Sequence, residues 1–229
     1  GFSFVAEINA LNSIFNKPKL PLTALIGGSK ISTKLELLNN LISKVDNLII
    51  GGGMANTFLA AQGFEIGTSI SESSMLKVAK SILDKSSKVG CKIHLPKDIV
   101  VADSLKATKS ETFRFDECPK AKMILDAGPT TVKNIKSIVH STETLIWNGP
   151  LGAFETKPYD NATNSAALIV AERTNSGKLI SVAGGGDTVS ALRTAGCAEN
   201  FSYLSTAGGA FLAWLEGRSL PGISALEEK

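Results

Sequence analysis

The chain has 229 residues, of which 43% are hydrophobic and 20% charged, and its formal net charge is +3 at pH 7. This composition supports a substantial core and argues against disorder. The charge is too small and too evenly spread to indicate nucleic acid or an anionic membrane as a partner. No apolar run reaches the length of a spanning helix and no basic-then-apolar leader stands at the start, so we expect a cytoplasmic protein without a membrane partner.

The cysteines and histidines offer little chemistry. Cys91, Cys118 and Cys197 are far apart and odd in number, which fits a reducing compartment better than a disulfide framework or a zinc site. We therefore expect them to be packing residues. His94 and His140 have no carboxylate or nucleophile nearby in the sequence, and we expect structural roles for both.

The hydrophobic pattern alternates between strands and helices in chain order. Residues 1–15 have apolar side chains at helical spacing and predict an amphipathic helix, which Pro18 and Pro21 end. Strands are expected at 23–28, 47–50, 92–95, 99–102, 123–126, 144–147, 179–183 and 202–204. Helices are expected at 31–44, 54–61, 74–89, 161–174, 188–194 and 209–216. The charged interval 106–122 is the most loop-like part, a candidate for an excursion at the sheet edge.

Short, uniformly apolar strands that alternate with helices are typical of a parallel sheet covered on both faces. We therefore expect an α/β fold with three layers, α/β/α, around a Rossmann-like, mainly parallel sheet. No linker or sharp change of composition interrupts the pattern. The sequence thus predicts one domain over residues 1–229.

Glycine-rich turns follow six of the expected strands. They are Gly27-Gly28, Gly51 to Gly53, Gly128-Pro129, Asn148 to Gly152, Gly184 to Gly186, and Gly208-Gly209. Glycine lets backbone N–H groups approach a ligand, and helix N-termini favour anions. Each turn alone would only permit a tight bend, but six on one edge of one sheet would form a phosphate-binding floor. Neither the P-loop pattern nor G-x-G-x-x-G is present, so neither of those sites has support.

Four charged residues accompany these turns. Lys30 and Lys34 are one helical turn apart at the start of the helix after the first strand, where a polyphosphate between them would offset their unfavourable place. The alternative is two solvated surface lysines. Asp187 follows three glycines and suits Mg²⁺ between carboxylate and phosphate, or else caps a helix that starts at Thr188. Glu155 could accept hydrogen bonds from ribose, or be a solvated charge.

The motifs resemble those of the phosphoglycerate kinase family over essentially the whole chain. The matching strings are GGSKISTK (27–34), IIGGGMANTFL (49–59), EIGTS (65–69), LPKD (95–98), WNGPLGAFE (147–155), GGGDT (184–188) and LPGISAL (220–226). One departure is Ala207, where the family commonly has glycine. If position 207 needs positive φ, alanine strains that turn by about a kcal/mol.

The resemblance implies site roles. It places Lys34 on the nucleotide phosphates, Lys30 near the transferring phosphoryl group and Asp187 on the magnesium ion. Residues implied to bind other parts of the nucleotide are Gly51, Gly52, Gly53 and Ile70 beside the adenine, Asn148, Pro150 and Glu155 at the nucleoside, Thr188 at the phosphates, and Gly128. The backbone amides of Gly185, Gly186, Gly208 and Gly209 would face charge that develops on the phosphoryl oxygens.

The reaction implied is reversible phosphoryl transfer between 1,3-bisphosphoglycerate and ADP, which gives 3-phosphoglycerate and ATP in glycolysis. The nucleophile is already ionised, so positioning and charge neutralisation suffice. The resemblance also implies that the chain is the C-terminal, nucleotide-binding half of an enzyme that is a monomer at full length. We then expect it to bind Mg-ADP or Mg-ATP, to be inactive alone, and to reach phosphoglycerate through an N-terminal domain. A stand-alone, non-catalytic nucleotide-binding domain is the main alternative, and a dinucleotide-dependent dehydrogenase a weaker one.

Overall fold

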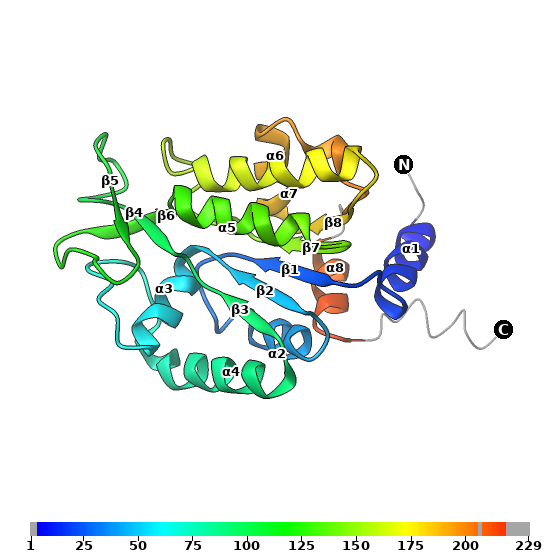
Figure 1. The fold of residues 1–229 in the computed structure, drawn as a ribbon, viewed down its shortest axis with the longest axis horizontal. Coiled ribbons are helices and arrows are strands. Elements are labelled where there is room, and N and C mark those ends of the chain that lie inside the picture. Colours follow the sequence, from blue (N-terminus) through cyan, green and yellow to red (C-terminus); the bar gives the residue numbers. More distant parts are fainter. Residues whose placement is uncertain (1–3, 206–207, 219–229) are drawn as a thin grey trace.

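A computed structural model describes residues 4–205 and 208–218 of the chain (Figure 1). Ala207 and the string 220–226 lie outside these residues. The architecture is built on a six-stranded sheet in the order β3-β2-β1-β7-β8-β9, whose neighbours are all paired in parallel. Its strands are β1 Leu22–Ile26, β2 Asn47–Ile50, β3 Lys92–His94, β7 Thr144–Asn148, β8 Ile180–Gly184 and β9 Tyr203–Ser205.

Helices cover both faces of this sheet, because successive strand residues point to opposite sides. Ala24 and Ile26 of β1 enter one core with α1, α2, α3, α4 and α8, whereas Leu25 between them enters a second core with α5, α6 and α7. The helices are α1 Phe4–Asn16, α2 Leu35–Ile42, α3 Gly52–Ala61, α4 Leu76–Val89, α5 Pro129–His140, α6 Asn161–Asn175, α7 Gly186–Thr194 and α8 Gly208–Leu215. Figure 1 shows α5 and α6 on one side of the sheet and α2 and α4 on the other. The predicted three-layer α/β/α fold is confirmed.

A second, smaller sheet departs from the prediction. The antiparallel strands β4 Asp98–Ala102, β5 Glu111–Arg114 and β6 Met123–Ala127 pair in the order β5-β4-β6 and form a separate sheet. The expectation that 99–102 and 123–126 belong to the main sheet is therefore wrong. No helix separates these strands, so a parallel crossover between them is not available. The interval 106–122 is not only a loop, since it contains the edge strand β5.

Two helix starts also differ from the prediction. The helix expected at 31–44 is Leu35–Ile42, so Lys30 and Lys34 lie in a turn before it and not one helical turn apart on its first turn. The helix expected to begin at Thr188 begins at Gly186. Helix α5 was not among the expected helices, although Gly128 followed by Pro129 at the first helical position is a start signal.

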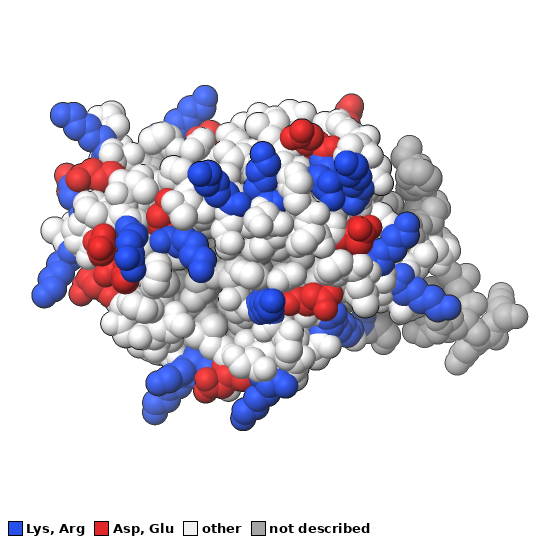
Figure 2. Space-filling view, in the orientation of Figure 1, with Lys and Arg blue, Asp and Glu red and all other residues white. Residues whose placement is uncertain are grey.

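The remaining polar features fit structural roles. His94 shares a 2.9 Å hydrogen bond with Asn47, and all three cysteines are buried and free. Burial, together with Lys97 and Lys92, lowers the pKa of His94. Figure 2 shows lysine and arginine mixed with aspartate and glutamate over the visible face, which agrees with the evenly spread charge. Among the residues that the structure describes, no helix has the length and apolarity to cross a membrane.

Candidate functional site

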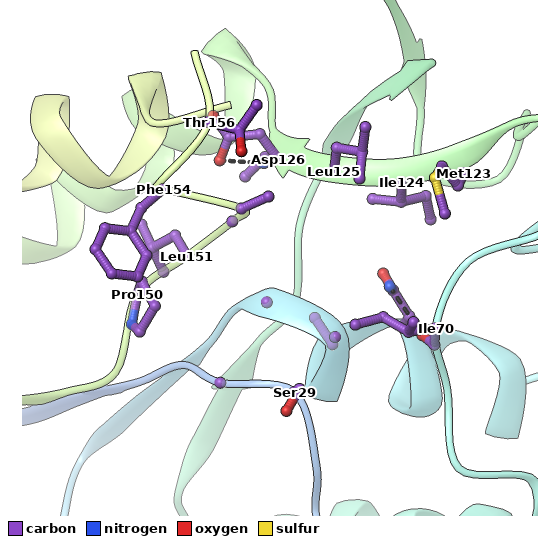
Figure 3. Close-up of a pocket in the computed structure, with 18 of the residues that line it drawn as sticks. Ser29, Ile70, Met123, Ile124, Leu125, Asp126, Pro150, Leu151, Phe154 and Thr156 are labelled. Atoms are coloured by element: carbon purple, nitrogen blue, oxygen red, sulfur yellow. Dashed lines mark hydrogen bonds between the residues drawn. The ribbon is translucent and has the colours of Figure 1, made fainter. Parts of the chain in front are cut away.

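The main cavity lies where the carboxyl ends of the parallel strands face the small sheet. It has a volume of about 390 Å³. One wall is β6, residues 123–127, and the facing wall contains Ser29, Gly52, Gly53 and Ile70. Figure 3 shows Met123 to Asp126 across the cavity from Ile70 and Ser29, with Pro150, Leu151 and Phe154 toward one end. Two separate sheets therefore enclose one cavity.

The floor of the cavity is made of interlocked backbone turns. A Cβ atom at Gly27 would lie 1.8 Å from the carbonyl oxygen of Pro150, and one at Gly51 would lie 2.4 Å from the Leu151 side chain. Gly52, at a φ of +71°, approaches Gly28 so closely that a Cβ atom would lie 2.5 Å from its carbonyl oxygen. Because only glycine permits these approaches, the turns after β1, β2 and β7 can present their backbone at one place.

Lys34 contacts the turns that form this floor. Its Nζ donates a hydrogen bond to the carbonyl oxygen of Gly27 and lies 3.1 Å from the place of a Cβ atom at Gly28. Burial lowers the pKa of Lys34 to about 8, although the nearby charge of Asp187 works to raise it. For Lys34 the solvated-lysine alternative is thus wrong. Lys30 is exposed and does not line the cavity.

Asp187 lies at the edge of the same floor. It belongs to the first turn of α7, is exposed and lines the cavity. Gly185 occupies the N-cap position, and no side-chain capping bond is present, so the N-cap alternative for Asp187 is wrong. Within the described ranges its carboxylate has no hydrogen bond or ion pair. That carboxylate is free to meet a ligand.

The donor set fits a magnesium ion that arrives with a phosphate. No group of three or more His, Cys, Asp or Glu that could hold a metal occurs in the part of the chain that the structure describes. Magnesium commonly uses one or two carboxylates and takes its other ligands from phosphate oxygens and water. Asp187 alone meets that requirement, whereas an all-protein metal site does not exist among these residues.

A buried network supports the turns after β7 and β8. Asn148 donates from Nδ2 to the carbonyl oxygen of Gly184 at 2.9 Å, and the amide of Gly149 donates to Thr188 Oγ1 at 2.7 Å. The Oδ1 atom of Asn148 is buried without a partner. Neither Asn148 nor Thr188 lines the cavity, so their contacts with a nucleotide stay predictions.

The other predicted residues divide into two groups. Those that line the cavity are Gly52, Gly53, Ile70, Pro150, Glu155 and Asp187; those that do not are Lys30, Gly51, Gly128, Asn148, Gly185, Gly186 and Thr188. Gly208 and Gly209 open α8. Gly128 follows β6 and so belongs to the small sheet, which means that the six turns do not share one sheet edge. It packs against Asp98, whose carboxylate accepts the amides of Thr130 and Thr131.

Sequence reasoning missed the wall formed by β6, together with Leu105 and Phe154. The one available signal was that an apolar strand, residues 123–126, runs directly into Gly128. Asp126 in this wall is 3% exposed and accepts the amides of Ala127 and Ala162 at 2.9 and 3.0 Å. Burial raises the pKa of Asp126 to about 7, against the effect of these hydrogen bonds and with a contribution from Asp160.

The cavity thus has two chemically different ends. Ile70, Met123 and Leu125 offer apolar surface at one end, and Gly28, Gly52, Gly53 and Asp187 line the other. Lys34 does not line the cavity itself, but it is bound to Gly27 in the turn beside this second end. Such a cavity suits a ligand that joins a flat apolar group to a polyphosphate. Among the described residues that line it, no nucleophile is paired with a base, so the cavity suits phosphate binding better than acyl transfer.

Comparisons with known proteins agree with this geometry. A family model described as phosphoglycerate kinase matches residues 1–218. The chain is 57% identical over 223 residues to a phosphoglycerate kinase from Dinoroseobacter shibae, and 52% identical over 228 residues to one from Zymomonas mobilis. The alignments cover 97% and 99% of the chain, and 57% of each of those proteins.

Solved structures give the same result. A phosphoglycerate kinase from Coxiella burnetii superposes with a TM-score of 0.93 at 41% identity, over 98% of this chain and 57% of that one. Another from Pyrococcus horikoshii superposes with a TM-score of 0.82 at 26% identity, over 99% and 56%. The chain therefore spans a little more than half the length of the relatives it matches.

Proposed function

The chain belongs to the phosphoglycerate kinase family, and from this premise we propose that it is the nucleotide-binding part of such a kinase, which binds Mg-ADP or Mg-ATP. The observation that carries the proposal is one cavity that pairs an apolar slot with a floor of glycine turns, next to which Lys34 is held by its bond to Gly27. A nucleotide likewise joins a flat, largely apolar base to charged phosphates.

The base would enter the slot between Ile70 and β6. Ile70 is 59% exposed, which leaves much of its side chain for a ligand to cover. Glu155 stands beside Phe154 at the cavity edge, where its carboxylate could accept ribose hydroxyls. Because apolar side chains dominate this end, the base would be bound mainly by burial of its faces.

The phosphates would lie over the glycine turns. Lys34 would supply a partly desolvated positive charge, which interacts more strongly with an anion than a solvated lysine does. Asp187 would hold magnesium together with phosphate oxygens, and the ion when bound would neutralise charge on the transferring group. The amides of Gly185, Gly186, Gly208 and Gly209, at the starts of α7 and α8, would face the same group.

The reaction would be the reversible transfer of a phosphoryl group between 1,3-bisphosphoglycerate and ADP in glycolysis. Catalysis of this kind rests on holding both substrates in line, which can contribute about 7–11 kcal/mol. The triose substrate would be held by the part of the relatives that this chain does not span, so we expect no appreciable turnover by the chain alone. A coupled assay, with and without an added N-terminal domain of a relative, measures this directly.

Isothermal titration tests the binding proposal. Mg-ADP should bind at one site, adenosine and Mg-pyrophosphate should each bind more weakly and compete with it, and NADH should not bind. Competition by both fragments is expected because each occupies one end of the cavity. Tighter binding of NADH than of ADP, or no heat with ADP by a folded chain, would contradict the proposal.

A further inference from the structure

Residues Ile70 to Glu72, here named the strap, connect the base end of the cavity with α3. The side-chain amide of Asn56 donates to the carbonyl oxygen of Ile70 at 3.1 Å. The backbone amide of Glu72 donates to Thr57 Oγ1 at 3.0 Å. Both Asn56 and Thr57 are buried in α3, so the backbone of the strap is fixed to a rigid helix at both ends.

The carboxylate of Glu72 reaches from the strap to a turn forty positions earlier in the chain. Its Oε1 accepts the backbone amide of Ser32 at 3.1 Å, and its Oε2 accepts the Ser32 hydroxyl at 2.5 Å. Burial works to raise the pKa of Glu72, but the hydrogen bonds from Ser32 and Ile31 and the charge of Lys30 outweigh it and lower that pKa. The group is therefore ionised at neutral pH and accepts both bonds as a carboxylate.

Ser32 lies midway between Lys30 and Lys34, in a turn whose inner side is anchored by Ile31, fully buried in the core. Inside the turn, Thr33 Oγ1 donates to the carbonyl oxygen of Lys30 at 3.0 Å, and the amide of Lys34 donates to Ile31 at 2.9 Å. The bond from Lys34 to Gly27 holds the inner side of the turn. On the outer side, where Lys30 stands exposed, the hydrogen bonds from Ser32 to Glu72 tie the turn to the strap.

We propose that Glu72 is a positioning residue for Lys30: its carboxylate fixes the turn that carries this lysine to the strap that carries Ile70. The inference rests on the proposed function, together with the role that the family resemblance implies for Lys30, near the phosphoryl group that ATP has and ADP lacks. It adds that the distance between the base end and the phosphoryl end is set through the strap. Glu72 is not among the residues that line the cavity, and we expect it to act mainly through its hydrogen bonds to Ser32.

The charge of Glu72 makes the proposal easy to test, because electrostatic repulsion and positioning of the turn would change the ATP affinity in opposite directions. A carboxylate near a polyphosphate repels it, so removal of the charge alone should tighten ATP binding. If Glu72 instead holds the turn in place, its removal should weaken ATP binding in spite of the lost repulsion. The sign of the change therefore separates a through-space effect from positioning.

The experiment measures the affinities of Mg-ATP and Mg-ADP for the chain and its Glu72→Gln variant. We expect the ATP affinity to fall about three- to tenfold, within the range for loss of one ordinary hydrogen bond, and the ADP affinity to change less than about twofold. Ser32→Ala, which keeps the carboxylate and removes only the hydroxyl donor, should produce a smaller loss in the same direction. In a Lys30→Ala background, Glu72→Gln should cause no further loss.

Glu65→Gln is the matched control. Glu65 lies in the same connection and accepts the amide of Gly67 at 3.0 Å, but it makes no hydrogen bond to the lysine turn. It should leave the ratio of ATP to ADP affinity unchanged. Thermal unfolding of each variant checks that the fold is kept. If Glu72→Gln does not fold, Ser32→Ala, at an exposed position, becomes the test variant.

Three results would overturn the inference. They are unchanged or tighter ATP binding by Glu72→Gln, equal losses for ATP and ADP, and a full additional loss in the Lys30→Ala background. If Lys30→Ala weakens ATP in those cases, the proposed function still stands. If the folded parent chain binds neither nucleotide, the proposed function itself is wrong.

Discussion

The six-stranded and three-stranded sheets supply opposite walls of one cavity by different means. The large sheet presents backbone, at turns where Gly27 and Gly51 leave no room for a side chain, with the partly buried Lys34 bound to one of these turns. The small sheet presents side chains from β6, and its own core contains three buried residues, Ile99, Val101 and Cys118. Phosphate binding would thus depend on close packing that few residue types permit, and base binding on apolar surface that many would provide.

The close packing can be broken at one position, with the largest expected effect. Gly27→Ala would place its Cβ atom 1.8 Å from the carbonyl oxygen of Pro150, so a backbone turn must move. We expect a loss of about 3 kcal/mol in the free energy of unfolding, at the upper end of overpacking costs, and loss of ADP binding. Urea unfolding measures it.

Gly186→Ala is the control for stability, because a Cβ atom there would meet nothing within 4 Å. A Gly27→Ala variant that unfolds at the same urea concentration as Gly186→Ala would show that the turns are not tightly interlocked.

Replacement of Lys34 should give the next largest effect, a loss of affinity for phosphate groups. Lys34→Met should weaken binding of ADP and pyrophosphate by about 1–3 kcal/mol, the range for hydrogen bonds to charged groups, and leave adenosine unchanged. The ammonium form binds phosphate, and burial lowers the pKa of Lys34 to about 8. The ADP affinity of the parent chain should therefore fall as the pH rises through about 8, because the lysine loses its proton.

Titrations at several pH values check this dependence. Lys34→Met should show a flat profile in the same pH range, since the titrating group is gone. A fall in affinity that persists in the variant would assign the dependence to another group.

Asp187→Asn tests the exposed edge of the large-sheet wall. We expect the affinity for Mg-ADP to fall by about 1 kcal/mol, while ADP in EDTA binds equally well or better, since the lost carboxylate repels phosphate when no cation is present. Titration calorimetry with and without magnesium measures these two affinities separately. Equal losses under both conditions would indicate a purely structural role for Asp187.

The base end should be the most tolerant. Ile70→Ala should weaken ADP and adenosine together by about 1 kcal/mol or less, since a ligand can cover only part of this side chain, and should not affect pyrophosphate. Leu168→Ala on α6 is a matched control, because Leu168 is 57% exposed, close to the 59% of Ile70, and lines no part of the cavity. An equal loss of pyrophosphate affinity would contradict the division into two ends.

The sequence predicted the large sheet better than the small one. Strands such as 47–50 and 144–147 are uniformly apolar and separated by helices, a pattern with one common solution. The strands 99–102 and 123–126 have the same local composition, and this composition does not predict which strands they pair with. The wall formed by β6 was missed for that reason, whereas the glycine turns, Lys34 and Asp187 could be proposed from the sequence because their residue types are unusual at strand ends.

The helix that was expected from Ile31 illustrates a different limit. Ile31, Leu35 and Leu38 keep helical spacing, so periodicity alone extends the helix to Ile31. In the structure the amide of Ser32 binds Glu72 instead, a residue forty positions away. A tertiary hydrogen bond of this kind overrides local pattern and leaves no trace in a short window of sequence.

The division of the cavity between two sheets has a consequence for local unfolding. Among the described residues, the small sheet has three buried residues in its own core, and regions with few buried apolar contacts open at a lower free energy than the rest of a protein. A nucleotide seated between β6 and Ile70 would bind only the closed form and so raise the opening free energy by mass action. Amide hydrogen exchange in β4 to β6 should then slow with ADP far more than exchange in β1 or β7. The exchange rates of the smaller sheet would therefore report whether the site is occupied.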